Sequence, residues 1–229
     1  EHMEISSVIS LDGGGGRSSV RFAGSDKLPN VEYSLRFRQQ PLAARSCGFA
    51  DRDRRVIDPP PIIQLTIKGT NLTPEEIGKQ LRNNHYIVSC SLYDESGSRD
   101  ATFMTEQRRQ ERQLLGTLVS TPFFGEDEHG KEGCFFCFPD LSCRSPGLFR
   151  LKFRLTEIDP TRAREVQRFP ELAVGNSGVF TVYTANDFPG MRASTRLVKC
   201  SKEQGCVIPI KQGNRLKNAR SHDRLDDEE

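Results

Sequence analysis

The strongest constraint in this sequence is the strict alternation of apolar and charged residues from Phe149 to Leu155. Its apolar members are Phe149, Leu151, Phe153 and Leu155, and Arg150, Lys152 and Arg154 lie between them. Successive side chains of a β-strand point to opposite faces of a sheet, so this period of two predicts a strand with a buried face and an exposed basic face. Residues 31–38 repeat the pattern with Tyr33, Leu35 and Phe37.

Five further segments have the apolar and β-branched composition of strands. They are residues 62–67, 86–93, 114–124, 134–138 and 179–183. Helix signals are few. Thr73, Pro74 and Glu76 form a capping box around a helix that ends near Asn83, and Ser194 or Thr195 caps a helix that stops at Gly205. Residues 105–115 are compatible with a helix or a long loop.

About seven strands with few helices between them favour an all-β fold with a few short helices, an antiparallel β-sandwich, over an α/β fold. The 229 residues divide into an N-terminal segment 1–28, one domain 29–212 and a charged tail 213–229. We expect the first segment to be disordered, because it contains four consecutive glycines and opens on Glu1-His2-Met3, which has the form of a tag remnant.

Composition excludes some classes of function. Lys and Arg number 33 against 31 Asp and Glu, so a nucleic-acid site would have to depend on where the charges lie. No apolar run approaches the roughly 18 residues of a membrane span, so we expect no membrane partner. No secretory signal is visible, and the seven cysteines are expected to be reduced in an intracellular protein.

The cysteines suggest two alternatives that we consider weaker. Cys134 and Cys137 form a C-x-x-C, but residues three apart on a strand point to opposite faces and cannot share a zinc ion. Cys47 beside Arg45 could be an activated nucleophile, although a packed or merely exposed thiol explains it better. No phosphate-binding glycine loop or nucleophile signature is present. We therefore expect no metal, no cofactor and no catalytic residue.

Basic residues form two clusters with amides among them. The first comprises Arg36, Arg38, Gln39, Gln40, Arg45, Arg52, Arg54 and Arg55. Arginine suits phosphate and guanine, and glutamine can pair with adenine, so this strand end and loop could contact DNA. A solvated loop neutralised by Asp51, Asp53 and Asp58 is an equally good explanation from spacing alone. The second cluster contains Lys199, Lys202 and Lys211 and continues into a tail that resembles a nuclear-import signal or a segment that contacts the DNA backbone.

Four blocks of the sequence resemble one known family, the velvet domain of fungal developmental regulators. They are YSLRFRQQPLAARSCGFADRDRRVIDPPPIIQL from Tyr33, GCFFCFPDLSCRSPGLFRLKF from Gly133, VFTVYTANDFPGMRASTRL from Val179 and NRLKNARS from Asn214. Within that family, the chain looks most similar to the spore-viability regulators.

The resemblance implies properties that the residue patterns alone do not. Velvet domains have an immunoglobulin-like β-sandwich similar to the Rel homology domain. They bind double-stranded DNA, pair with themselves or with other velvet proteins, and act in the nucleus. The spore-viability regulators control spore maturation, trehalose accumulation and asexual development. By the Rel comparison, residues 38–55 would read the major groove. We expect Arg38 and Arg45 to contribute most, because both lie next to the end of the first strand, where the backbone is best fixed.

Three hypotheses follow from the sequence. The first is a sequence-specific DNA-binding transcription regulator. The second is a protein-interaction module that forms velvet homodimers or heterodimers and meets DNA only within the complex. The third, an enzyme using Cys47, has no positive sequence signal.

Overall fold

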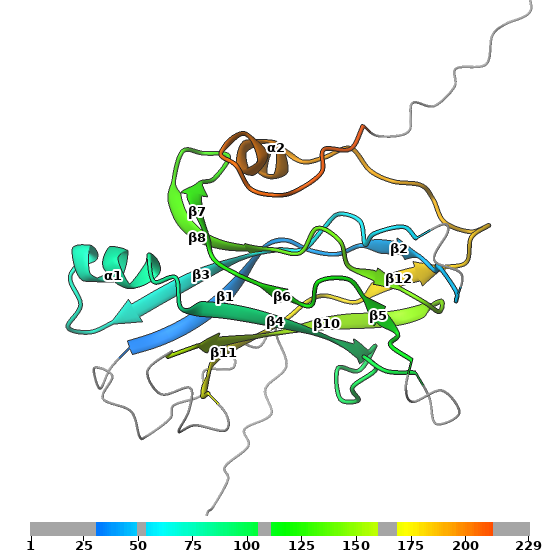
Figure 1. Cartoon of the computed structure of the whole chain (residues 1–229), viewed down its shortest axis with the longest axis horizontal. Helices are drawn as coiled ribbons and strands as arrows, with labels where there is room; N and C mark the ends of the chain where they lie inside the picture. The colour runs from blue at the N-terminus through cyan, green and yellow to red at the C-terminus, as the bar shows by residue number, and fades with distance from the viewer. Residues whose placement is uncertain (1–30, 50–53, 105–110, 160–168, 213–229) are drawn as a thin grey trace, which may run out of the picture.

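The computed structural model describes residues 31–49, 54–104, 111–159 and 169–212. Two β-sheets face each other across an apolar core (Figure 1). The first sheet, sheet A, has the order β1-β3-β8-β7 and is antiparallel. Its strands are β1 (Val31–Gln39), β3 (Ile62–Gly69), β7 (Phe123–Glu126) and β8 (Glu132–Cys137).

The second sheet, sheet B, has the order β2-β12-β10-β4-β6, and β11 also pairs with β10. Its strands are β2 (Ala43–Arg45), β4 (Tyr86–Asp94), β6 (Val119–Ser120), β10 (Gly147–Glu157), β11 (Glu171–Asn176) and β12 (Phe180–Tyr183). Only the β2–β12 pair of this sheet is parallel. A separate short ladder joins β5 (Leu114–Leu115) to β9 (Ser142–Cys143). The all-β sandwich predicted from the sequence is confirmed.

The main core consists of the inward-facing side chains of both sheets. Phe153 of β10 is fully buried, and its ring packs against Phe37 of β1 at 5.4 Å and against Phe138 at 5.0 Å between centroids. The alternation in β10 therefore places Leu151, Phe153 and Leu155 in the core, as predicted.

The opposite face of β10 differs from the prediction. Arg150, Lys152 and Arg154 are half-buried rather than exposed, because neighbouring strands supply partners for them. Arg154 pairs with Glu171 of β11 at 3.1 Å and donates to the Tyr93 hydroxyl at 2.9 Å. Phe149, predicted to be buried, is only partly so.

In the part of the chain that the structure describes, two short helices interrupt the strands. Helix α1 (Pro74–Leu81) has the predicted capping box, in which Thr73 Oγ1 accepts from Glu76 N and Glu76 accepts from Thr73 N. Helix α2 (Arg196–Glu203) begins after Thr195 and lies over β7 and β8 on the outer face of sheet A (Figure 1). Gly205, with φ +94°, follows it. In the described ranges, no helix is long and apolar enough to span a membrane.

Helix α2 forms a second, smaller core with the outer face of sheet A. Its buried members are Ile62, Phe135, Leu197, Val198, Cys206 and Ile208, with Phe123 and Cys137 packed against them. Cys134 lies in the main core instead. The two cysteines of the C-x-x-C therefore face opposite sides of β8, as the strand argument predicted.

Other differences from the prediction concern short elements. Residues 114–124, expected as one strand, are divided among β5, β6 and the start of β7. Strands β2, β9 and β11 were not predicted. The stretch 105–110, for which a helix or loop was expected, lies outside the described residues.

Candidate nucleic-acid interface

The candidate interface lies at the end of the sandwich where β2 ends, opposite α1 (Figure 1). Arg45 is the last residue of β2 and is half-buried. The backbone after it is fixed on two sides. Ser46 N donates to Tyr183 O at 2.8 Å, and Cys47 N donates to Cys143 O at 3.1 Å. The loop that follows β2 therefore has a defined path at its start.

Arg144 stabilises the start of this loop by hydrogen bonding to Gly48. We did not predict a functional role for this residue from the sequence. Its Nη1 donates to Gly48 O at 3.1 Å, and its Nε donates to Arg112 O at 2.9 Å. Its guanidinium lies 5.4 Å from the ring centroid of Phe49, a residue that is 49% exposed. Arg144 thereby joins the segments around residues 48, 112 and 144. No sequence signal reveals its contact with Gly48, because the two residues are 96 positions apart.

Arg54 anchors the other end of the loop. Its Nε donates to Ser142 Oγ at 2.6 Å, its Nη2 donates to Asp140 O, and the Asp140 carboxylate lies 4.0 Å away. The same carboxylate accepts from Thr117 N at 3.0 Å. Arg55 is exposed beside it. Arg52, with Asp51 and Asp53, lies outside the described residues.

Five arginines lie on the segments that these contacts join, and we call them the arginine end: Arg45, Arg54, Arg55, Arg112 and Arg144. Two acidic residues of the described chain are neighbours of this set: Glu111 precedes Arg112 in the sequence, and Asp140 contacts Arg54. Only part of this set was predicted from the sequence. Arg112 and Arg144 come from separate segments and reach the loop through the hydrogen bonds of Arg144.

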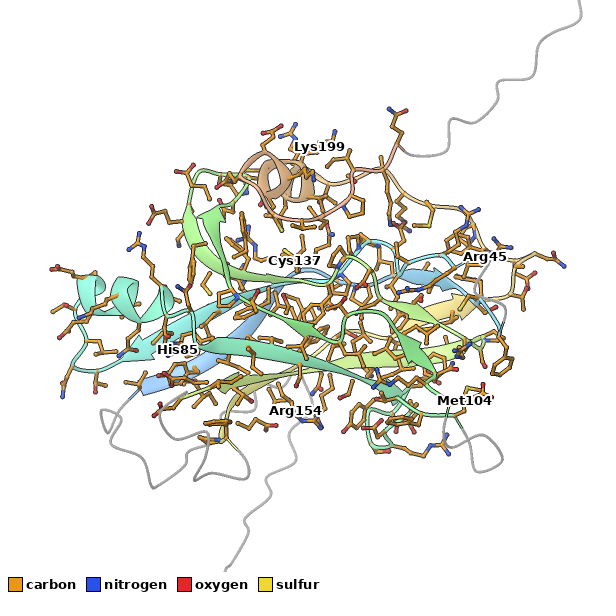
Figure 2. The ribbon with its side chains drawn as sticks, in the orientation of Figure 1. Arg45, His85, Met104, Cys137, Arg154 and Lys199 are labelled. Atoms are coloured by element: carbon orange, nitrogen blue, oxygen red, sulfur yellow. The ribbon has the colours of Figure 1, made fainter. Side chains whose placement is uncertain are left out.

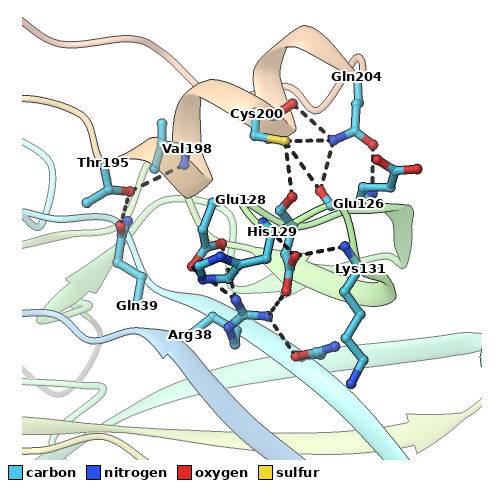
Figure 3. A network of polar contacts seen from close by, with 12 residues as sticks. Arg38, Gln39, Glu126, Glu128, His129, Lys131, Thr195, Val198, Cys200 and Gln204 are labelled. Carbon is cyan, nitrogen blue, oxygen red and sulfur yellow. Dashed lines mark hydrogen bonds and ion pairs between the residues drawn. The ribbon is translucent and has the colours of Figure 1, made fainter.

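Arg38 has a different environment (Figure 3). Its guanidinium donates to Gln64 at 3.0 Å, to Asp127 at 3.0 Å and to Glu128 at 3.1 Å, and it lies 5.9 Å from the Phe135 ring centroid. Only 12% of its side chain is exposed. Because these internal acceptors occupy its guanidinium, we no longer expect Arg38 to be one of the main DNA contacts.

Asp127 is the buried partner of Arg38. Burial opposes ionisation of its carboxyl. Hydrogen bonds from the backbone N–H groups of Lys131 and His129, together with the Arg38 guanidinium, outweigh that effect and lower its pKa to about 2. The ion pair therefore fixes the β7–β8 turn against β1.

The remaining residues of the first cluster divide between the interior and the surface. Gln39 is buried, where its amide donates to Pro60 O at 2.7 Å and accepts from Thr195 Oγ1 at 2.6 Å. Gln40 is exposed and accepts from Gly178 N at 3.1 Å. Arg36 is exposed on the outer face of β1. The Gln39 side chain is therefore buried with internal hydrogen-bond partners and does not face solvent.

The second basic cluster is also divided. Lys199 and Lys202 are exposed on α2, and Figure 2 places Lys199 well away from Arg45. Lys211 is mostly buried and pairs with Asp58 at 3.3 Å. Burial lowers the pKa of its ammonium, and the carboxylate of Asp58 opposes that shift. Lys211 therefore holds the segment after α2 to the stretch of chain that precedes β3.

Among the described residues, no group of three or more His, Cys, Asp or Glu is arranged to hold a metal ion. Cys47 is half-buried, and its Sγ donates to Cys143 O at 3.4 Å. This hydrogen bond places the thiol against the backbone of β9, in keeping with a packed cysteine.

Comparison with known proteins identifies the family. The family model described as Velvet factor matches residues 33–111 and 100–215. A sexual development regulator velC of Gibberella moniliformis is 61% identical over 228 residues, which is 99% of this chain and 49% of that protein. A sexual development regulator VELC of Pyricularia oryzae is 57% identical over 83% of this chain and 43% of its own length.

A spore development regulator vosA of Beauveria bassiana is 56% identical over 84% of this chain and 71% of its own length. Similar proteins thus carry both the sexual and the spore regulator names. The chain spans about half the length of the first two relatives. The resemblance inferred from the four sequence blocks is confirmed, and the chain belongs to the velvet family.

Proposed function

We propose that this chain is a nuclear, sequence-specific DNA-binding regulator of fungal spore maturation, viability and asexual development, and that the arginine end contacts DNA. The proposal is supported most directly by the arginines that three separate segments contribute to one end of the sandwich. Phosphate contacts by arginine position a protein on DNA, and a few side chains at base edges select the sequence. No chemical step is required.

The bracing of the loop supports this assignment. Arg54 and Arg144 use their guanidinium groups to hold the backbone on either side of residues 50–53. Arg45, Arg55 and Arg112 are then positioned by a scaffold that is already fixed. Backbone that is already held in place, as on the two sides of residues 50–53, loses less conformational entropy when the protein binds.

The names of similar proteins support the biological part of the proposal. The relatives are called sexual or spore development regulators. Residues 213–229, which lie outside the described part, include the basic stretch that resembles a nuclear-import signal or a segment that contacts the DNA backbone.

A binding experiment tests this function. The purified chain is incubated with pooled random duplexes, and bound sequences are recovered and counted. We expect enrichment of a motif by the parent chain and loss of that enrichment when Arg45, Arg55 and Arg112 are all changed to Ala. This variant leaves the bracing residues Arg54 and Arg144 intact.

The control carries the same change of charge at the other end of the molecule. Lys68, Lys79 and Arg82 are exposed on β3, on α1 and just after α1. Their combined change to Ala should keep the enriched motif. Equal loss in both variants would mean that only overall charge matters, and retention in both would remove the arginine end from the interface.

A second candidate function is pairing with another velvet protein or with a second copy. Leu42, Leu148 and Val179 are 44%, 44% and 37% exposed. They lie on or beside adjacent strands, since Leu148 is opposite Thr181 and Thr181 N donates to Leu42 O at 3.3 Å. Light scattering of the parent chain and of Leu148→Asp, each alone and with a partner velvet protein, would separate an interaction module from an independent DNA binder.

A further inference from the structure

Two cysteines from distant parts of the sequence meet under α2. Cys137 ends β8, and Cys206 follows the helix. Both belong to the second core, where they pack with Ile62, Phe135 and Leu197. Their side chains lie close enough for each thiol to influence the pKa of the other. Neither cysteine forms a disulfide in the structure.

The surroundings make the two thiols chemically unequal. The neighbouring Cys137 thiol and the Lys202 ammonium lower the pKa of the Cys206 thiol, although burial opposes this. The Cys206 thiol and burial both raise the pKa of the Cys137 thiol. A thiolate is the nucleophilic form of cysteine. The Lys202 ammonium favours a thiolate at Cys206, so we assign the attack to Cys206 and the resolving step to Cys137.

Among the other cysteines of the described chain, Cys143 also has cysteine neighbours, Cys47 and Cys90, but burial and Cys47 both raise the pKa of its thiol. Cys90, Cys134 and Cys143 are buried, and burial raises the pKa of each thiol. Cys200 lies in α2, six residues before Cys206. Its Sγ contacts Glu126 O at 3.6 Å and Asp127 O at 3.5 Å (Figure 3). It faces the β7–β8 turn instead of Cys137.

We propose that Cys137 and Cys206 form a site of reversible oxidation, in which a peroxide converts the pair to a disulfide that fastens the end of α2 to sheet A. The Cys206 thiolate attacks one peroxide oxygen and breaks the O–O bond. Its sulfur is oxidised to a sulfenic acid, and the other oxygen leaves as hydroxide. Cys137 then attacks the sulfenic sulfur, the S–S bond forms, and a second hydroxide leaves. With the protons of the two thiols, the products are one disulfide and two waters.

The disulfide would close a long loop of the chain. The segment between Cys137 and Cys206 contains β9, β10, β11, β12 and α2. Cross-linking a long loop restricts the unfolded chain, so the oxidised protein should be more stable than the reduced one. It would also fix α2, which carries Lys199 and Lys202, on the sheet. The protein would thus exist in two forms, one with free thiols at Cys137 and Cys206 and one with a disulfide between them.

Peptide mapping tests the site directly. The purified full chain is treated with hydrogen peroxide, its remaining thiols are blocked with iodoacetamide, and it is digested with trypsin without reduction. We expect peptide 132–144 to be joined to peptide 203–211 with loss of two hydrogens, and fragmentation to place the bond at Cys137. Dithiothreitol should separate the two peptides. This result does not require any variant to fold.

Variants and thermal melting complete the test. Cys206→Ser and Cys137→Ser should each abolish the joined peptide, whereas Cys200→Ser should keep it. Peroxide should raise the melting temperature of the parent by at least about 5 °C and leave Cys137→Ser unchanged. A bond to Cys134 or Cys143 would overturn the proposal. So would peroxide-treated protein in which Cys206 remains alkylated as a free thiol.

Discussion

At the scale of single residues, arginines close together in the sequence have different environments. Arg38 is almost enclosed by Gln64, Asp127 and Glu128, whereas Arg55 is exposed beside the loop that follows β2. Removing a charge that has buried partners leaves those partners without a counter-ion. An exposed charge has little effect on stability and can reach a charged ligand.

This difference gives a paired prediction. Arg38→Met should lower the free energy of unfolding by about 1.5–3 kcal/mol, because it removes charge-assisted hydrogen bonds. DNA affinity per folded molecule should stay unchanged. Arg55→Met should keep the free energy of unfolding within about 0.5 kcal/mol of the parent value and should weaken DNA binding. Urea denaturation and fluorescence anisotropy measure the two effects. An affinity loss confined to Arg38→Met would contradict this assignment.

Asp127 predicts a pH dependence. Its pKa is about 2 in the folded chain, compared with an ordinary value of 3.8. A lowered carboxyl pKa stabilises the fold fully above the ordinary value and progressively less as pH falls toward the folded value. Asp127→Asn should therefore be less stable than the parent at neutral pH. As the pH falls from about 3.8 to about 2, its free energy of unfolding should decrease less than that of the parent. The matched control is Glu132→Gln, at an exposed carboxylate. Parallel urea midpoints for Asp127→Asn and the parent across this range would refute the argument.

The core prediction concerns two residues of one strand. Phe153→Ala should cost about 3–5 kcal/mol, because it removes a fully buried ring that packs against Phe37 and Phe138. Leu148→Ala, on the outer face of β10, should change stability by less than about 0.5 kcal/mol. Chemical denaturation compares them, and equal losses would mean that the strand register is wrong.

At the scale of secondary structure elements, local pattern decided what could be predicted. Strands β3 and β10 have long apolar or alternating runs, and α1 has a complete capping box, so each was identified from neighbouring residues. Strands β2 and β9 have only three and two residues, too few to establish a period. They form because partner strands from other parts of the chain supply their hydrogen bonds.

The two helix caps differ in what else they contact. Thr73→Ala should cost about 1 kcal/mol, because it removes one acceptor at the start of α1. Thr195→Ala should cost more, about 2 kcal/mol, because Thr195 also donates to the buried Gln39 side chain. Urea denaturation of both variants measures the difference. A larger loss for Thr73→Ala would show that Thr73 stabilises more than the start of α1.

At the scale of the whole molecule, the candidate interface is a product of the fold. The sequence predicted Arg45, Arg54 and Arg55, since they are close together in the chain. It could not predict Arg112 or Arg144, because only the tertiary structure brings their segments to Gly48. Likewise, the sequence grouped Arg38 and Gln39 with the loop, whereas packing under α2 and against the β7–β8 turn gives them internal partners.

The central claim is that the arginine end contacts DNA phosphates, and the salt dependence of affinity tests it most directly. The slope of log affinity against log salt falls by about 0.9 for each phosphate that the protein no longer neutralises. Changing Arg45, Arg55 and Arg112 to Ala should therefore reduce the slope by up to about 3, whereas changing Lys68, Lys79 and Arg82 to Ala should leave it at the parent value. An unchanged slope in the first variant would contradict the account.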